Sequence, residues 1–270
     1  MYNKNSIHFT HSPFFILAGI LLAGVVLYLT LPLLALFFRT NVDLLVESFF
    51  QQKVQKALFL SLTTTIVTTI IILIVGTPAA YIQSRVEYPG KNFVETCIDL
   101  PIVLPPAVAG FALLLMYGRV GLLGQYLILY GIRIPFTTTA VIMAQLFVAA
   151  PLYIRHAKSL FSQMDLSYEE AARSLGAGHF RVFRTITLPL AKIGLLSGAI
   201  LAYARALGEF GATIMFAGNL PGVTQTMPLA IYTAMQSDLN TAVTISLLLI
   251  MISLVIMFLT RYISGDEKNA

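Results

Sequence analysis

The chain has 270 residues, of which 57% are hydrophobic and 11% charged, and its formal net charge is +5. Soluble domains carry about 25% charged residues, so this composition excludes an ordinary water-soluble protein and predicts one embedded in a lipid bilayer. The basic residues flank apolar runs and form no separate basic domain, which argues against nucleic-acid binding. The single cysteine, Cys97, excludes an internal disulfide framework and a cysteine-rich metal site.

Six apolar segments approach or exceed the ~20 residues that an α-helix needs to cross the membrane. In chain order they are residues 13–38, 57–84, 100–118, 134–156, 190–216 and 239–261. The first is longer than a signal-peptide core and no Ala-x-Ala-like cleavage site follows it, which favours a membrane anchor over a signal peptide. Residues 120–132 are too short to cross and predict a re-entrant or interfacial helix. We therefore expect an all-α membrane protein with one domain over residues 1–270.

Prolines interrupt the third segment. Pro105 and Pro106 remove two backbone donors and free carbonyl groups on the preceding turn, and Gly110 follows. Such a break is tolerated at membrane depth only where protein or a water-filled cavity covers it. It indicates either a kink that shapes packing or a helix N-terminus whose free N–H groups suit an oxyanion. Both interpretations remain open.

The loop charges predict an orientation. Residues 157–189 hold several Lys and Arg side chains, whereas residues 217–240 hold none. Cytoplasmic loops carry the excess of Lys and Arg, so residues 157–189 and both termini, with Lys4 and Arg261, are expected inside the cell. Three basic residues of the first outer loop oppose the rule: Arg39, Lys53 and Lys56.

The inside loop contains a short helix signal. Ser167 is a plausible N-cap, and Glu170 three residues later would complete a capping box. Gly176 and Gly178 end the helix, and Pro189 marks the first turn of the next span. The small apolar face of Ala171, Ala172 and Leu175 suits insertion into a groove on a partner. A plain capped helix in the membrane interface would share part of this pattern.

Ionisable and polar residues in the spans are candidates for a translocation pathway. Arg205 and Glu209 lie four apart on one helix face, and each costs about 2.5–3.5 kcal/mol within a span. They form either a structural ion pair or part of an anion route, in which Arg205 attracts and Glu209 prevents tight retention. Gln145 could line the same route. Residues 218–228 predict an extracellular turn, and Asp238 predicts a helix cap.

The spacing Glu170-Ala171-Ala172, Gly176 and Ile186-Thr187-Leu188-Pro189 resembles the EAA loop by which permeases of ABC importers dock onto their ATPase. The chain is similar, from about residue 55 to 260, to permeases of the molybdate/tungstate and sulfate branch, and closest to molybdate permeases. Further matching stretches are residues 100–110, 117–124, 206–213 and 216–232.

This resemblance implies a transport subunit rather than an enzyme. Its expected partners are a second permease copy, two cytoplasmic ATPase subunits and an extracytoplasmic oxyanion-binding protein, in a bacterial or archaeal cell membrane. No Gly-x-x-x-x-Gly-Lys-[Ser/Thr] sequence is present, so ATP and Mg²⁺ are expected on the ATPase, with no cofactor on this chain. The expected coupling residues are Glu169, Glu170, Ala171, Ala172, Leu175, Gly176, Ile186, Leu188 and Pro189. The candidate pathway residues are Pro105, Pro106, Gly110, Gln145, Arg205 and Glu209.

Other functions remain as alternatives. Tungstate or sulfate/thiosulfate could replace molybdate as the cargo. An intramembrane metalloprotease would need His-Glu-x-x-His, a spacing that the four histidines do not have. A passive channel would leave the inside loop without a motor to engage, and its transport would not depend on an ATPase.

Overall fold

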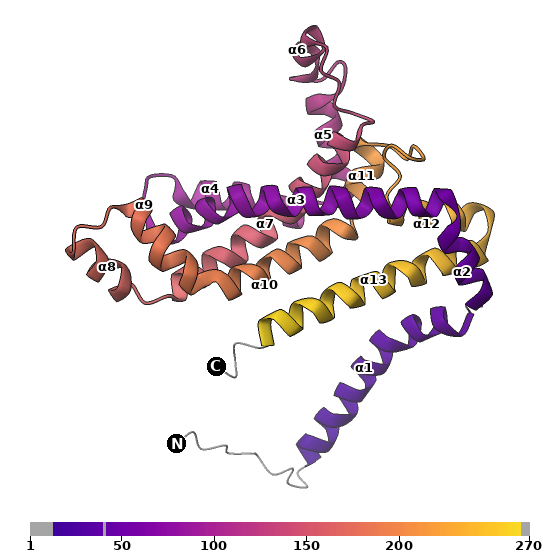
Figure 1. The fold of residues 1–270 in the computed structure, drawn as a ribbon, viewed down its shortest axis with the longest axis horizontal. Coiled ribbons are helices and arrows are strands. Elements are labelled where there is room, and N and C mark those ends of the chain that lie inside the picture. The colour runs from indigo at the N-terminus through magenta and orange to yellow at the C-terminus, as the bar shows by residue number, and fades with distance from the viewer. Residues whose placement is uncertain (1–12, 40–41, 266–270) are drawn as a thin grey trace.

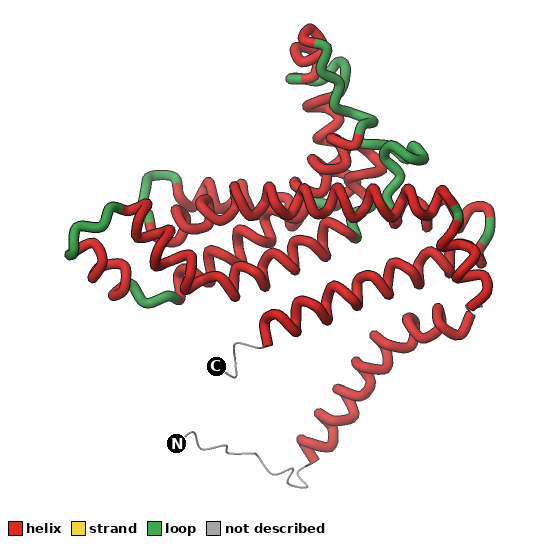
Figure 2. The backbone as a smooth tube through the Cα atoms, in the orientation of Figure 1, coloured by secondary structure: helices red, strands yellow, loops and turns green. Residues whose placement is uncertain are grey.

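The computed structural model describes residues 13–39 and 42–265, which form helices joined by loops and no strand. Its centre is three long helices that lie side by side: α3 (Gln52–Arg85), α7 (Thr138–Gln163) and α10 (Leu188–Leu207) (Figures 1 and 2). Five of the described helices are long and apolar enough to cross a membrane, or six if α4 and α5 count as one bent span. The expected all-α membrane architecture is confirmed.

Small side chains bring the central helices together. Buried alanines line the interface, among them Ala80, Ala149 and Ala202. The fully buried ring of Tyr153 lies so close to α3 that a Cβ on Gly76 would approach its Cδ1 atom to 2.9 Å. Small residues at membrane helix interfaces permit this close approach, which gives packing and interhelical hydrogen bonds.

Gln145 belongs to this interface. Its Oε1 accepts from the hydroxyl of Thr68 at 3.0 Å, and its Nε2 donates to Thr65 at 3.3 Å. All three side chains are buried. Gln145 therefore holds α7 to α3, and the structure does not present it to a pathway as the sequence suggested.

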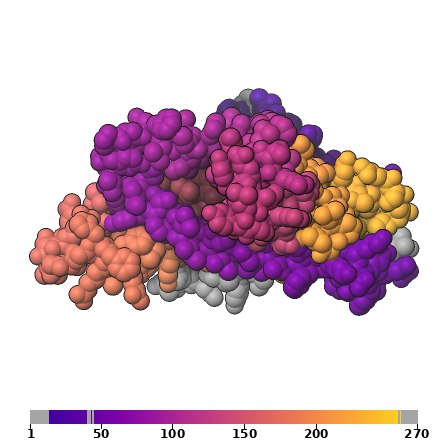
Figure 3. All heavy atoms as spheres, turned by 90° about the horizontal axis from the view of Figure 1, so that it is seen from above, coloured from indigo at the N-terminus to yellow at the C-terminus, as the bar shows by residue number. Residues whose placement is uncertain are grey.

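The third apolar segment is broken as its prolines predict, but it does not cross straight. Helix α4 (Lys91–Val103) ends before Pro105, and α5 (Pro106–Tyr117) leaves it at 116°. With the short α6 (Gly124–Leu127) and the 3₁₀ helix η1 (Ile128–Tyr130), α5 forms an arm that stands away from the central helices (Figure 1). Seen from above, a hollow separates the arm in magenta from α4 in purple (Figure 3).

The predicted helix over residues 120–132 is wrong in its extent. Only α6 and η1 form there, because the chain first folds back on the end of α5. The N–H groups of Leu122 and Leu123 donate to the carbonyls of Leu115 and Met116. A Cβ on Gly124 would lie 1.8 Å from the carbonyl oxygen of Gly118, so this turn requires glycine.

The fifth apolar segment is also divided. Helix α10 ends at Leu207, and a separate short helix α11 (Gly211–Phe216) packs across α5. A Cβ on Gly211 would lie 2.9 Å from Cβ of Pro106. The break places Glu209 outside both helices, whereas the sequence placed it within one span.

We expect Gly110→Ala to destabilise the contact between α5 and α11. The new Cβ would lie 2.5 Å from the carbonyl oxygen of Ala212 and 2.7 Å from its Cα, and backbone atoms move less readily than a flexible side chain. Overpacking of this kind costs about 1–3 kcal/mol. The measurement is the thermal midpoint of the purified protein, with Gly19→Ala as control because its Cβ would meet nothing within 4 Å. Equal midpoints for the two variants would contradict the close packing.

The remaining helices lie beside the centre. They are α1 (Pro13–Arg39), α2 (Val42–Phe50), α12 (Met227–Ser237) and α13 (Leu239–Gly265). The start of α1 and the end of α13 point toward the end of the molecule that carries the helix α8 (Figure 1). Lys4 lies outside the described residues, as does the side chain of Arg261.

Helix α12 was not predicted, because the sequence treated residues 217–240 as a loop without Lys or Arg. Its residues Leu229, Ala230 and Ala234 are buried beside α3 and α13, and the N–H of Met227 donates to the hydroxyl of Ser61 at 2.7 Å. Asp238 follows and caps α13, as predicted, by accepting from the N–H of Asn240 at 3.0 Å.

A candidate coupling surface and pathway

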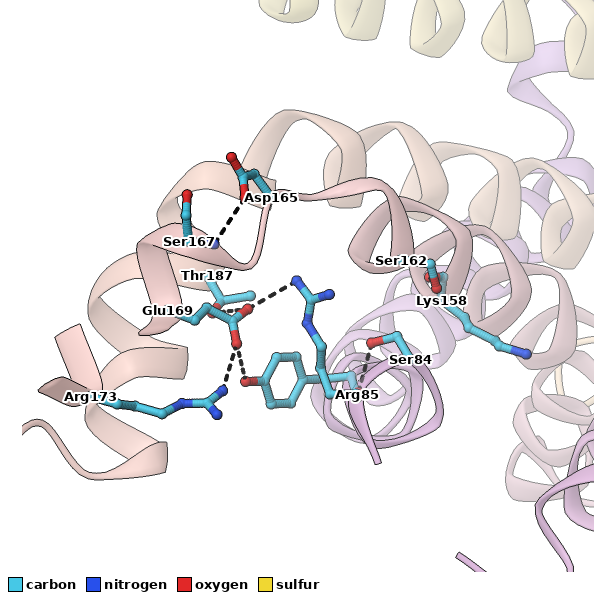
Figure 4. Close-up of polar contacts among 10 residues, drawn as sticks. Ser84, Arg85, Lys158, Ser162, Asp165, Ser167, Glu169, Arg173 and Thr187 are labelled. Carbon is cyan, nitrogen blue, oxygen red and sulfur yellow. Dashed lines mark hydrogen bonds and ion pairs between the residues drawn. The ribbon is translucent and has the colours of Figure 1, made fainter. Parts of the chain in front are cut away.

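The candidate coupling surface lies at the end of the long helices, where α7 gives way to a loop. Helix α8 (Ser167–Ser174) follows, and then α9 (His179–Val182) and the π-helix η2 (Phe183–Thr187) run on into α10. Figure 4 shows this corner of the molecule, with α8 folded back toward the end of α3.

The start of α8 differs from the predicted capping box. Ser167 is already helical, and its N–H donates to Oδ1 of Asp165 at 2.9 Å. This backbone hydrogen bond lowers the pKa of Asp165 below its usual value. A short aspartate side chain reaches the N–H two residues on, so Asp165 performs the role that the sequence assigned to Ser167.

The end of α8 is as predicted. Gly176 adopts a left-handed φ of 84°, and its N–H donates to the carbonyl of Arg173. The N–H of Ala177 donates to the carbonyl of Ala172. This paired arrangement is a Schellman motif, in which glycine is favoured because it has no Cβ to clash.

Glu169 anchors α8 to the rest of the protein. One carboxylate oxygen accepts from Arg85 and from Thr187, each at 3.1 Å. The other accepts from Tyr81 at 3.0 Å and from Arg173 at 3.1 Å. The Glu169 side chain is 2% exposed, and Figure 4 shows it between Arg85, Arg173 and Thr187. A single buried carboxylate thus joins the end of α3, helix α8 and the π-helix before α10.

Glu170 does not take part in this cluster and is exposed, as is Ala171. The side chain of Leu175 is also exposed, with an exposed fraction of 90%. Ala172 is half-buried. The helix therefore has an anchored side and a free side, and the free side carries the exposed side chain of Leu175. The sequence grouped Glu169 and Glu170 together, and it did not identify Arg85 or Tyr81 as their neighbours.

The predicted coupling residues after Gly176 lie in one continuous helix. Ile186 and Leu188 are half-buried, and Pro189 is exposed. Pro189 lies in the first turn of α10, as predicted, although residues 179–207 are helical without interruption. The π-helical turn of residues 183–187 stands directly before it. A missing proline N–H disturbs the regular hydrogen-bond ladder, and the wider π turn accommodates this change.

Arg205 and Glu209 form the ion pair that their spacing suggested, with 2.7 Å between the guanidinium and Oε2. The Glu209 side chain is 1% exposed and that of Arg205 is 32% exposed. The other oxygen, Oε1, accepts from the N–H of Ala212 at 2.8 Å. Glu209 therefore also holds the start of α11, a structural role that accounts for its burial.

Four of the six candidate pathway residues meet around the break between α10 and α11. Pro106 and Gly110 of α5 touch α11, which Glu209 caps and Arg205 neighbours. Pro105 is the residue at which α4 and α5 part. Gln145 serves the α3–α7 interface instead. Among the described residues no group of three His, Cys, Asp or Glu side chains could hold a metal ion.

Residues 73–266 match the family described as the inner membrane component of binding-protein-dependent transport systems. The chain belongs to this family. It is 37% identical to the probable transport system permease protein NifC of Clostridium pasteurianum, over 93% of this chain and 90% of that protein. It is 40% identical to the molybdenum transport system permease protein ModB of Mycobacterium tuberculosis, over 86% and 88% of the two chains. For ModB of Escherichia coli K12 the identity is 41%, over 74% and 90%.

Solved structures share the fold. A bacterial ABC transporter that imports the acidic polysaccharide alginate aligns with a TM-score of 0.74 at 16% identity, covering 93% of this chain and 95% of that one. An inward-facing methionine transporter, MetNI, aligns with a TM-score of 0.61 at 18% identity, covering 79% and 95%. The family and these relatives identify the chain as a permease subunit of a binding-protein-dependent transport system.

Proposed function

We propose that this permease subunit carries a tetrahedral oxyanion, molybdate first of all, into the cytoplasm. The relatives named as molybdenum permeases support this cargo, because they are about 40% identical over most of the chain. Tungstate and sulfate or thiosulfate are the alternatives within the same branch. The observation that carries the proposal is α8, an exposed helix with a face of small residues. Glu169 at the start of this helix binds Arg85 of α3 and Thr187 directly before α10.

The geometry suggests how an ATPase would move the bundle. A partner that grips the free side of α8 would apply force to a helix that cannot swing independently, because Glu169 binds Arg85 of α3 and Thr187 beside α10. Displacement of α8 would therefore shift the long helices together. In this proposal each of two permease copies meets one ATPase, which holds ATP and Mg²⁺.

The proposal also assigns sides of the membrane. The α8 end, and with it both termini, faces the cytoplasm, in agreement with the basic charge of residues 157–189. The opposite end, with residues 218–226, faces an extracytoplasmic binding protein. The cargo passes the break between α10 and α11, where Arg205 supplies positive charge.

Crosslinking tests the coupling surface. In a Cys97→Ser background, Ala171→Cys is expected to crosslink to the ATPase in the assembled transporter, because Ala171 is exposed on α8. Tyr130→Cys is the control, since Tyr130 is 81% exposed on the arm, which stands apart from α8 (Figure 1). In proteoliposomes, molybdate uptake should stop when the ATPase cannot hydrolyse ATP. Uptake that continues without hydrolysis would favour a channel and refute the proposal.

A further inference from the structure

The arm contains a cavity that the coupling surface and the pathway do not explain. Its volume is about 290 Å³, and it lies between the end of α5, the α6–η1 turn and the residues that lead into α7. The cavity is therefore part of the arm, which stands beside the middle of the central helices and apart from the corner that carries α8 (Figure 1). Arg119 and Arg133 both line it.

The charge of this cavity is uncompensated. No acidic residue lines it, and residues 100–164 contain no Asp or Glu at all. Within the described part of the chain, neither Arg119 nor Arg133 has an ion pair or a hydrogen bond from its side chain. The remaining walls are largely apolar, including Leu114, Ile128 and Pro135. Low-dielectric walls strengthen the attraction between a charge and its counter-ion.

Three glycines form the turn that encloses one side of this cavity. Gly118, Gly121 and Gly124 turn the chain back on α5, and a Cβ at any of them would clash with a backbone oxygen at 2.4 Å or less. Arg119 lies inside this turn and is exposed. The glycines therefore fix the backbone that presents Arg119 to the cavity. Nothing in the packing of α5 requires an arginine there.

The cavity also borders the segment that follows α11. Phe136, which lines it, has a left-handed φ of 62°, a costly conformation for a residue other than glycine. Its ring lies against Gly218, where a Cβ would approach Cδ1 to 2.9 Å. Gly218 follows α11, the helix that Glu209 caps. The wall of the cavity thus touches the segment next to the proposed route.

The geometry points to a binding site in the arm for a tetrahedral oxyanion group, held by Arg119 and Arg133. Guanidinium groups present paired donors that match such oxygens. The group is either the free cargo, captured before it enters the pathway, or the phosphate of an anionic lipid. Only the identification of the ligand as the transported cargo rests on the proposed function; the binding of an oxyanion group does not.

Binding is tested first, without transport. Native mass spectrometry of the detergent-solubilised permease–ATPase complex with added sodium tungstate, and separately with phosphatidylglycerol, should show a retained adduct. The double variant Arg119→Gln/Arg133→Gln should lose it, and Arg119→Lys/Arg133→Lys should keep most of it because the charges remain. The control is Lys56→Gln, which removes one charge from an exposed residue of α3 that does not line the cavity. A thermal midpoint equal to wild type confirms that the double variant is folded.

Uptake into phosphatidylcholine vesicles then separates the sources. If the cargo is the ligand, the Arg-to-Gln double variant raises the apparent KM for molybdate about tenfold, with a maximal rate within twofold of wild type. Added salt then reduces the difference in apparent KM between the variant and wild type, because it screens the arginine charges. If lipid phosphate is the ligand, only phosphatidylglycerol retention changes. Tungstate retention in a wild-type complex that imports no oxyanion would refute the proposed function and leave the site intact. If wild type and the double variant retain tungstate and phosphatidylglycerol equally, the proposed site at Arg119 and Arg133 is refuted.

Discussion

Glu169→Ala is expected to loosen α8 and to uncouple ATP hydrolysis from uptake. The substitution removes four hydrogen-bond acceptor contacts at once, and it leaves the guanidinium of Arg85, whose side chain is 10% exposed, without its carboxylate. Loss of one partner from a buried ion pair costs about 3–5 kcal/mol. Because the solvated Arg173 recovers part of its hydration, we expect about 3 kcal/mol, seen as a lower thermal midpoint of the purified transporter.

The functional consequence is separable from the loss of stability. With α8 loosened, the ATPase would still bind and hydrolyse ATP, but its movement would no longer reach α3 and α10. Molybdate uptake per ATP hydrolysed should fall at least tenfold in proteoliposomes at a temperature where the variant is folded. Glu169→Gln should be intermediate, because its single amide oxygen can still accept from Thr187 or from Tyr81, which bind different oxygens of the carboxylate, but it carries no charge.

Two control variants make the result specific. Glu87→Gln removes a carboxylate that is 88% exposed and that pairs, within the described ranges, only with Lys91, so both stability and coupling should stay at wild-type values. Glu170→Gln alters the exposed side of α8 and should leave the thermal midpoint unchanged while weakening the link to the ATPase. If Glu169→Ala transported with normal coupling, Glu169 would not be the anchor through which force passes.

Hydrophobic runs predicted most of the membrane architecture because crossing a bilayer is a constraint on length and composition alone. The prolines at 105 and 106 predicted a break, since the loss of backbone donors is a local property. The direction of the chain after the break is not local. It depends on the close contact of Gly110 with Ala212, a hundred residues away.

Residue roles were harder to predict where two neighbours have the same chemistry. Glu169 and Glu170 are adjacent carboxylates, and only the positions of Arg85 and Tyr81, more than eighty residues earlier, decide which one is buried. Helix α12 was missed because its sequence is uncharged, short and follows a Gly-rich stretch, yet burial against α3 and α13 stabilises it. Arg85 could have been found from the sequence, as the basic residue that ends the second apolar segment.

Substitutions of Arg205 and Glu209 can distinguish a structural role of this ion pair from a role in transport. Arg205→Ala would leave the Glu209 carboxylate, 1% exposed, with the N–H of Ala212 as its one remaining contact among the described residues. An unpaired buried charge costs about 3–5 kcal/mol. Glu209→Gln should be milder, because an amide oxygen can still accept from Ala212, although Arg205 then keeps its charge without a counter-ion.

The double variant Arg205→Met/Glu209→Gln is expected to be more stable than Arg205→Met alone, because no buried charge remains uncompensated. The interaction between the two substitutions should be about 1–3 kcal/mol in thermal or chemical unfolding. Molybdate uptake should nevertheless stay low in the double variant, since the positive charge of Arg205 is gone from the α10–α11 break. Stability that recovers while uptake does not would assign Arg205 to the anion route. Recovery of both would make the pair structural, and normal uptake by a folded Arg205→Ala transporter would place the route elsewhere.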